Sequence, residues 1–366
     1  MIRHRTSWSV GGSQAHAGYY AASGVLANGQ VLVTGGSVLQ AAESITAVSN
    51  ADLFNPATNT WTPAASMSIE RQQHTATVLQ SGQMLVSGGN YGSGYAGVSN
   101  DVFDSGEVYD PTSNSWSSAG TMSTPRYEHT ASLLANGTVL VAGGNDLVGT
   151  CSCTTFVSSV DLYNPASNSF TATGALVTAR YAHTATVLAN GMVLVAGGFG
   201  GATSTLQSGG APLASAELYN PTTGTWTATG SMTTAHMNHT ATLLPSGEVL
   251  VAGSYTGSAT TATAEVYDPS SGTWTAVASM STPRQSQGAA LLPNGPVLIV
   301  GGLNGASSAV IGVGTAEVYD PTSNTWTPSG GMVTARQFFV LNALGDGRIR
   351  LDGGSPNAFG LPEFYK

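Results

Sequence analysis

A pair of adjacent glycines recurs along this sequence at nearly even intervals. Successive pairs lie 48 to 56 residues apart, and most follow a short run of apolar residues. The pairs begin at Gly35, Gly88, Gly143, Gly197, Gly253, Gly301 and Gly353, with serine as the second residue after Gly253. A repeat of about 50 residues with this content indicates units that stack because none can bury both of its faces alone.

Each repeat reads as four antiparallel strands. In the copy that starts at His183, an Asn-Gly step separates two apolar runs, which predicts a tight β-hairpin. A third strand carries Glu217 and Tyr219, an Asn-Pro turn follows, and a fourth strand begins at Trp226. No segment has helical periodicity, so the sequence predicts an all-β fold made of antiparallel meanders.

The Gly-Gly pair, the Glu-Val-Tyr-Asp-Pro segment of residues 265–269 and the following Trp274 resemble the kelch motif. The resemblance covers nearly the whole chain and is to bacterial-type kelch proteins, and to the propeller core of galactose oxidase-like proteins. It implies a seven-bladed β-propeller with four antiparallel strands in each blade.

The two ends of the sequence complement each other. Residues 362–366 match the third strand of a repeat, and Thr6-Ser7-Trp8 match the start of a fourth strand. Trp8 precedes Gly29 by the same 21 residues that separate Trp61 from Gly82. We therefore expect an N-terminal strand of about residues 5–10 to complete the blade formed by 337–366, in a single propeller domain over 1–366. Such closure removes the exposed sheet edges.

The amino-acid composition limits the classes of partner that the protein can bind. Only 8% of the residues are charged, and the net charge is −9. Nucleic acids and anionic membranes require a basic surface, so neither is expected as a partner. No apolar run approaches the ~20 residues of a membrane span. We expect a monomer that is extracellular or periplasmic, with its targeting segment outside this sequence; a cytoplasmic protein is the alternative.

Ten residues after the aromatic residue of each fourth strand, a basic residue recurs. The positions hold Arg71, Arg126, Arg180, His236, Arg284 and Arg336, with Gly18 in the remaining copy. Every third strand carries an acid: Asp52, Glu107, Asp161, Glu217, Glu265, Glu317 and Glu363. A ring of cations could recognise a carboxylate, but one acid and one base per repeat are most simply each other's partners. On that interpretation Arg180→Ala costs about 1–3 kcal/mol.

Four histidines stand three residues after this basic position in consecutive repeats: His74, His129, His183 and His239. Zinc ligands must converge within a few ångströms, whereas equivalent positions on neighbouring blades lie further apart. We expect interblade hydrogen bonds rather than a metal site, and no cofactor. Cys151 and Cys153 lie in one loop, where they could form a small disulfide or remain thiols.

The kelch resemblance also raises the copper-radical oxidases, which use a Tyr-Cys cross-link and a Tyr-His dipeptide. This sequence has no Tyr-His dipeptide, and both cysteines lie in one loop. The iron motif of kelch specifier proteins, Glu-x-x-x-Asp-x-x-x-His, is absent too. Nucleophile-elbow, zinc-protease and phosphate-loop motifs are likewise missing. We reject the copper-oxidase activity and favour a non-catalytic role over an enzymatic one.

In a four-stranded blade, the loops from strand two to strand three and the connections between blades emerge on one face. We call it the loop face, and the opposite face the turn face. The loops on the loop face are long and variable, which is typical of a binding surface. The sequence therefore predicts a non-catalytic module that binds a peptide, protein or glycan there. The candidate ligand-binding residues are Tyr19, Tyr20, Gln73, Tyr127, Glu128, Tyr181, Met237, Asn238 and Phe338.

A cofactor-independent lyase or isomerase is the alternative function. Its acid–base groups would be Glu128, His129 and Tyr127, the one cluster in which a repeat departs from the pattern with titratable side chains.

Overall fold

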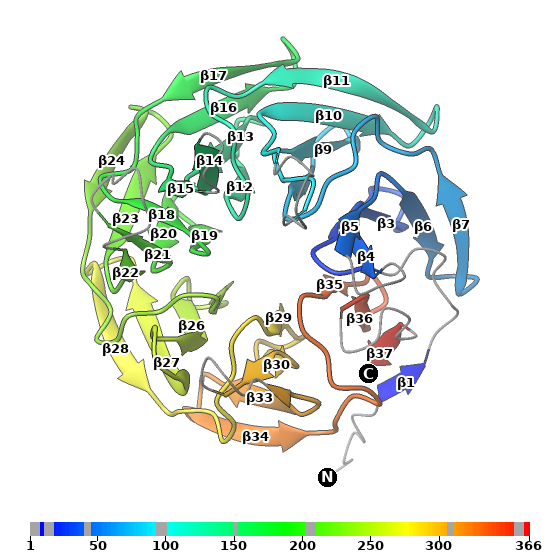
Figure 1. The fold of residues 1–366 in the computed structure, drawn as a ribbon. Coiled ribbons are helices and arrows are strands. Elements are labelled where there is room, and N and C mark those ends of the chain that lie inside the picture. Colours follow the sequence, from blue (N-terminus) through cyan, green and yellow to red (C-terminus); the bar gives the residue numbers. More distant parts are fainter. Residues whose placement is uncertain are drawn as a thin grey trace.

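The structure, a computed structural model, is built from β-strands arranged in a ring (Figure 1). It describes residues 8–10, 18–39, 45–92, 101–148, 153–201, 210–305, 311–354 and 362–366. Within these ranges there are seven four-stranded antiparallel sheets, one for each repeat. The expected seven-bladed kelch-type propeller is therefore confirmed.

The first strand of each sheet is four residues long and lies on the inner side of the ring. These strands are β2 (Ala22–Val25), β8 (Thr75–Val78), β12 (Thr130–Leu133), β19 (Thr184–Val187), β25 (Thr240–Leu243), β29 (Gly288–Leu291) and β35 (Val340–Ala343). Each contacts the first strand of the blade before it and of the blade after it, and β35 contacts β2. The ring is therefore closed.

The second strands are the apolar runs that end at the Gly pairs, and the third strands carry the recurring acids. The second strands are β3 (Val31–Thr34), β9 (Met84–Ser87), β13 (Val139–Ala142), β20 (Val193–Ala196), β26 (Val249–Tyr255), β30 (Val297–Val300) and β36 (Ile349–Asp352). The third strands are β6 (Ala51–Asn55), β10 (Ser105–Asp110), β16 (Val160–Asn164), β23 (Ala216–Asn220), β27 (Thr260–Asp268), β33 (Ala316–Asp320) and β37 (Glu363–Tyr365).

The fourth strands form the outer rim of the ring (Figure 1). They are β7 (Thr60–Ala64), β11 (Ser115–Thr121), β17 (Ser169–Thr173), β24 (Thr225–Ala228), β28 (Thr273–Val277), β34 (Thr325–Ser329) and, in the last blade, β1 (Trp8–Val10). Strand β1 pairs with β37, with Trp8 opposite Tyr365. The Trp8 indole N–H donates to the Gly330 carbonyl of the preceding blade at 2.9 Å. The N-terminal strand thus closes the last blade, as expected.

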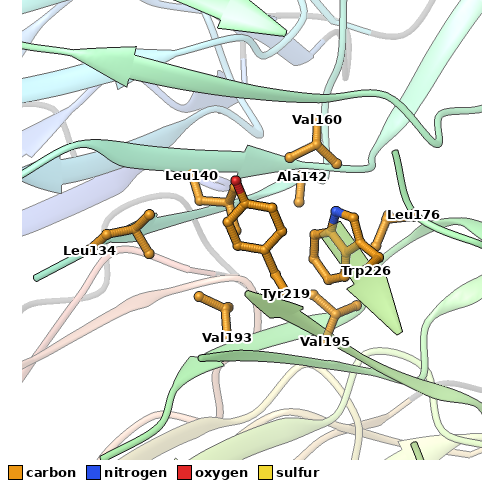
Figure 2. Packing of buried hydrophobic residues seen from close by; sticks show 9 residues of the cluster. All are labelled: Leu134, Leu140, Ala142, Val160, Leu176, Val193, Val195, Tyr219 and Trp226. Carbon is orange, nitrogen blue, oxygen red and sulfur yellow. The ribbon is translucent and has the colours of Figure 1, made fainter. Parts of the chain in front are cut away.

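Apolar side chains fill the space between neighbouring blades. Figure 2 shows the cluster between the third and fourth blades, where Leu140 of β13 packs near Tyr219 and Trp226 of the next sheet. The aromatic rings of Tyr219 and Trp226 lie 5.1 Å apart, and the Trp226 indole N–H donates to the Gly174 carbonyl. Each sheet therefore buries one face against each neighbour, which is why the repeats need one another.

The glycine pairs allow neighbouring blades to approach closely. Gly143 has a φ of +63°, and a Cβ atom there would lie 2.6 Å from the Arg180 carbonyl oxygen of the next blade. The following residue, Gly144, donates its N–H to that same carbonyl at 2.8 Å. The contact needs a residue without a side chain at position 143. Ser254, the second residue of the degenerate pair, keeps the equivalent N–H donation to Arg284.

Several loops on the loop face carry short strands of their own. They are β4 (Ser37–Leu39) with β5 (Ile45–Ala47), β14 (Asn145–Val148) with β15 (Cys153–Phe156), β18 (Ala179–Tyr181) with β21 (Phe199–Gly201) and β22 (Ala211–Pro212), and β31 (Leu303–Asn304) with β32 (Ile311–Gly312). Cys151 and the side chain of Cys153 lie outside the described part of the chain, so their pairing stays a prediction. No helix in the described ranges could span a membrane.

Candidate functional site

The recurring charges form buried pairs of a basic and an acidic side chain inside six of the seven blades. In the fourth blade the Arg180 guanidinium donates to Glu217 at 2.8 Å, to the carbonyl oxygens of Gly197 and Ser215, and to the Ser215 hydroxyl. Arg71–Glu107, Arg126–Asp161, Arg284–Glu317 and Arg336–Glu363 pair in the same way at 2.8 to 3.1 Å. In the fifth blade, His236 takes the place of arginine and lies 3.2 Å from Glu265.

These acids also hold the connection from the preceding blade. The Glu217 carboxylate accepts hydrogen bonds from the backbone N–H groups of Val177 and Thr178. Arg180 and Glu217 together are therefore a structural joint rather than a recognition surface. In the first blade Gly18 stands at the basic position, so Asp52 lies outside this pattern.

The four repeated histidines bridge neighbouring blades, as predicted. His183 lies 3.0 Å from the Thr130 hydroxyl of the preceding blade, and His74, His129 and His239 contact Thr34, Thr75 and Thr184 equivalently. Burial, and then the nearby Arg71 or Arg180, lowers the pKa of His74 and His183 to about 3. Burial likewise holds the pKa of His129 and His239 well below the ordinary value. All four are neutral near pH 7.

A ring of seven residues, one from each blade-to-blade connection, lies inside these joints on the loop face. All seven have φ between +50° and +54°, although none is glycine. We call them the inner ring: Tyr20, Gln73, Glu128, Ala182, Asn238, Ser286 and Phe338. Within the ring, six backbone N–H groups donate to the carbonyl oxygen of the neighbouring member at 2.8 to 3.3 Å. Backbone hydrogen bonds therefore fix the ring, whatever the side chains are.

A hollow of about 260 Å³ opens at this ring. It is lined by Tyr20, Ala21, Gln73, His74, Glu128, His129, Phe338 and Phe339, which come from four blades. The rings of Tyr20 and Phe338 lie 4.5 Å apart, centroid to centroid. Aromatic side chains thus border the hollow together with the side chain of Glu128.

A chain of side-chain amides ends at Glu128. Gln72 donates to the amide oxygen of Asn90 at 3.1 Å, Asn90 donates to Gln73 at 2.8 Å, and the Gln73 amide donates to Oε1 of Glu128. Among the described residues, no basic side chain pairs with Glu128. Burial therefore dominates, and it raises the pKa of Glu128 to about 7 despite the Gln73 hydrogen bond.

Three tyrosines lie close enough to this carboxylate for its charge to affect their pKa values. Burial, and then the charge of Glu128, raises the pKa of Tyr181 to about 12 and those of Tyr20 and Tyr127 further. The Tyr127 hydroxyl accepts a hydrogen bond from Asn145 at 2.9 Å. Tyr181 stacks on Phe156 and packs against Phe199. All three phenols remain protonated at neutral pH.

The structure brings together some of the predicted site residues and separates others. Tyr20, Gln73, Glu128 and Phe338 line one hollow, and Tyr127 and Tyr181 lie within electrostatic reach of Glu128. Tyr19, Met237 and Asn238 do not line it: Tyr19 and Met237 pair with Ser37 and Tyr255, and Asn238 contacts Gln285.

The predicted acid–base cluster is not assembled as a Glu–His pair. The His129 ring nitrogen Nε2 faces the hydroxyls of Thr75 and Ser87 in the blade interface, and its Nδ1 has no hydrogen-bond partner among the described residues. Sequence reasoning missed Asn90 and Phe156. Asn90 directly follows a Gly pair, at the position that pairs with the inner-ring connection, and this placement could have identified it.

The residues that the structure describes include no set of side chains placed to bind copper. No group of three or more His, Cys, Asp or Glu side chains there is placed to hold a metal ion. The buried histidines have threonine hydroxyls at one ring nitrogen, and each comes from a different blade interface.

Comparison with known families matches two kelch descriptions. The "KLHDC2/KLHL20/DRC7 Kelch-repeats domain" matches residues 128–354, which is more than half of the chain. The "Kelch motif" matches residues 18–68 and 73–123. No curated protein matches the sequence.

Solved structures with the same fold include a fungal alcohol oxidase of the AA5 family, determined in complex with copper. It is 18% identical, with a TM-score of 0.76 over 99% of this chain and 76% of its own. The structure of YjhT is 13% identical, with a TM-score of 0.63 over 88% of this chain and 100% of its own. At these identities the likeness concerns the fold alone.

Proposed function

The chain belongs to the family of kelch-repeat β-propellers, and from this premise we propose that it binds a peptide segment of a protein partner at the inner ring of the loop face. Kelch propellers generally mediate protein interactions. The proposal assigns that role to the hollow around Glu128 and to the neighbouring side chains of Tyr20, Tyr127, Tyr181 and Phe338.

The proposal depends on one observation: the backbone of the inner ring is the same in every blade, whereas its side chains are not. The backbone of this ring repeats seven times with nearly constant φ, yet its side chains differ from blade to blade. Their variety is therefore not required by the fold. It produces a hollow with aromatic faces, an oriented amide donor and one carboxylate, which is the mixture typical of a specific recognition site.

The alternative functions receive less support from the same geometry. An acid–base enzyme would need a paired base, but the His129 imidazole contacts Thr75 instead, and the raised pKa values of the tyrosines leave no phenolate at neutral pH. Glycans also bind to aromatic faces, so a glycan ligand remains the competing use of the hollow.

The proposal is tested with a defined random-peptide array and a glycan array, probed with the purified protein. Peptides are expected to bind, with at least a tenfold loss of affinity in Tyr127→Ala, because the substitution removes an aromatic face beside Glu128. Glu248→Gln is the matched control, since Glu248 lines a hollow of about 350 Å³ on the turn face.

Thermal unfolding of both variants separates lost binding from lost folding, and Tyr127→Phe provides a second variant that keeps the ring. Binding of peptides that is insensitive to Tyr127→Ala, or that is weakened by Glu248→Gln, would refute the proposed location. Binding to glycans alone would replace the peptide by a glycan.

A further inference from the structure

Glu128 differs from the recurring acids of the third strands in having no cationic partner. Six of those acids each lie within 3.2 Å of arginine or histidine. Glu128 receives one amide hydrogen bond at Oε1, and no described residue donates to its other oxygen. Glu128 is half-buried, and a partly desolvated carboxylate without a counter-ion is favoured by a ligand that supplies the opposite charge.

The loop face of the second and third blades carries further negative charge. Glu70, Asp101, Asp104 and Asp146 lie in the loops and connections of the second and third blades, partly or fully exposed. Six of the eight arginine and lysine residues in the described ranges are buried: Arg71, Arg126, Arg180, Arg284, Arg336 and Arg350. The other two, Arg348 and Lys366, lie at the turn face, where Arg348 pairs with Asp346. The described loop face is therefore acidic.

The neighbours of Glu128 suit a cation and its N–H donors. The aromatic rings of Tyr20 and Phe338 line the same hollow, and aromatic faces attract ammonium and guanidinium groups. Two buried acceptors near this site, Gln72 Oε1 and Asn145 Oδ1, have no hydrogen-bond partner among the described residues. The second carboxylate oxygen of Glu128, to which no described residue donates, can accept a hydrogen bond from a ligand N–H group.

The size of the hollow limits what can enter. At about 260 Å³ it is smaller than most pockets for drug-sized molecules, which begin near ~300 Å³. One long side chain fits such a space better than a whole metabolite. Lysine and arginine carry their charge at the end of an apolar stem, so the stem would lie along Phe338 and Tyr20 while the charge reaches Glu128.

We propose that the hollow takes a basic side chain, the ammonium of lysine or the guanidinium of arginine, from the bound peptide as the counter-ion of Glu128. This inference rests on the proposed function and specifies its ligand class. It makes Glu128 the specificity-determining residue and the aromatic pair the walls that hold the stem.

The proposal entails a pH dependence with a defined sign. Burial raises the pKa of Glu128 to about 7, so its carboxyl is increasingly neutral below that pH while lysine and arginine stay charged. The groups that face it are Tyr20, Tyr127 and Tyr181, with His74 and His129 lining the hollow and Asp146 near Tyr127. The tyrosines and histidines do not titrate between pH 5 and 8. Affinity should therefore fall by about tenfold for each pH unit below 7.

The test uses an array of capped hexapeptides in which one central position holds lysine, arginine, glutamine or glutamate. Lysine or arginine peptides should bind at least tenfold more tightly than the glutamine peptides at pH 8, and the preference should disappear in Glu128→Gln. Glu248→Gln should keep it. Butylammonium is measured separately, because binding of the free amine without any basic peptide would overturn the peptide assignment.

Failure of this inference is distinguishable from failure of the proposed function. Peptides that bind at the same site, lost in Tyr127→Ala but unaffected by Glu128→Gln, would refute the cation and leave the peptide site standing. A preference for glutamate peptides, or an affinity that does not change between pH 5 and 8, would also overturn it. Peptide binding that neither substitution affects would refute both.

Discussion

The blade joints and the inner ring enclose acidic side chains in opposite ways. At the joint of the fourth blade, Glu217 is buried with a guanidinium at 2.8 Å and two backbone N–H donors. At the inner ring, Glu128 has a neutral amide as its hydrogen-bond donor, and burial raises its pKa to about 7. The first arrangement stabilises the carboxylate, and the second leaves it in need of a partner.

The joints and the inner ring differ in whether the repeated structure requires a particular side chain. At the joints the side chains themselves hold neighbouring segments together, so arginine, acid and histidine recur. At the inner ring the backbone N–H and C=O groups hold neighbours together, so each side chain is free to vary. The positive φ of non-glycine residues costs energy at each ring position, and the hydrogen-bonded ring maintains it.

Breaking a joint should have the largest effect. Arg180→Ala removes hydrogen bonds to Glu217, Gly197 and Ser215, and leaves the Glu217 carboxylate buried without its counter-ion. Loss of one partner of a buried ion pair costs about 3–5 kcal/mol, which exceeds the 1–3 kcal/mol expected from the sequence. Urea unfolding of the variant measures the loss.

Arg180→His is the matched control, because the fifth blade uses His236 at the same position with contacts to Glu265 and Gly253. It should cost less than Arg180→Ala. If both variants are as stable as the wild type and ligand binding is lost, the arginines form a recognition ring after all.

The neutral histidines of the blade interfaces should make the joints sensitive to acid. The pKa of His183 is about 3 in the folded protein and near 6.5 once unfolded, so unfolding takes up a proton between these values. Stability from this group is complete above pH 6.5 and is lost as the pH falls. When the pH is lowered from 6.5 to 4.5, the free energy of unfolding of the wild type should therefore fall by about 2–3 kcal/mol more than that of His183→Gln.

Glutamine is a suitable replacement because Gln287 occupies the equivalent position in the sixth blade and donates to the Ala252 carbonyl. Free energies of unfolding measured at several pH values check this prediction. Parallel curves for the wild type and His183→Gln would contradict it, because they would show that the pKa of His183 is the same in the folded and the unfolded protein.

The sequence predicts the joints well because each joint repeats. Arg180 and Glu217 recur at constant spacing, and reciprocal charges at constant spacing have few other interpretations. The closure of the last blade by the strand of Trp8 could also be predicted from the repeat. The last copy lacks its fourth strand, and a matching strand stands at the start of the sequence.

The inner ring was only partly predictable because its assembly depends on contacts between blades. Glu128 stands out in the sequence, and Asn90 stands directly after a Gly pair, but the hydrogen bonds from Asn90 to Gln73 and from Gln73 to Glu128 depend on side-chain orientations that the sequence does not show. The orientation of His129 was also inaccessible: adjacency to Glu128 suggested a pair, whereas positive φ at Glu128 turns the two side chains to different surroundings.

The most direct test of the difference between joint and inner ring compares Glu128→Gln with Glu217→Gln by urea unfolding at pH 5 and pH 8. Because the pKa of Glu128 is raised, the folded protein holds a proton that the unfolded chain has released between about pH 4.3 and pH 7. Stability from this group therefore falls as the pH rises across that range and is level above it. Glu128→Gln should therefore be more stable than the wild type at pH 8, by about 1–2 kcal/mol, and nearly equal to it at pH 5. Glu217→Gln should be less stable than the wild type at both values. A loss of stability at pH 8 in Glu128→Gln would contradict the account, because it would show that Glu128 is a stabilised carboxylate like the acids of the joints.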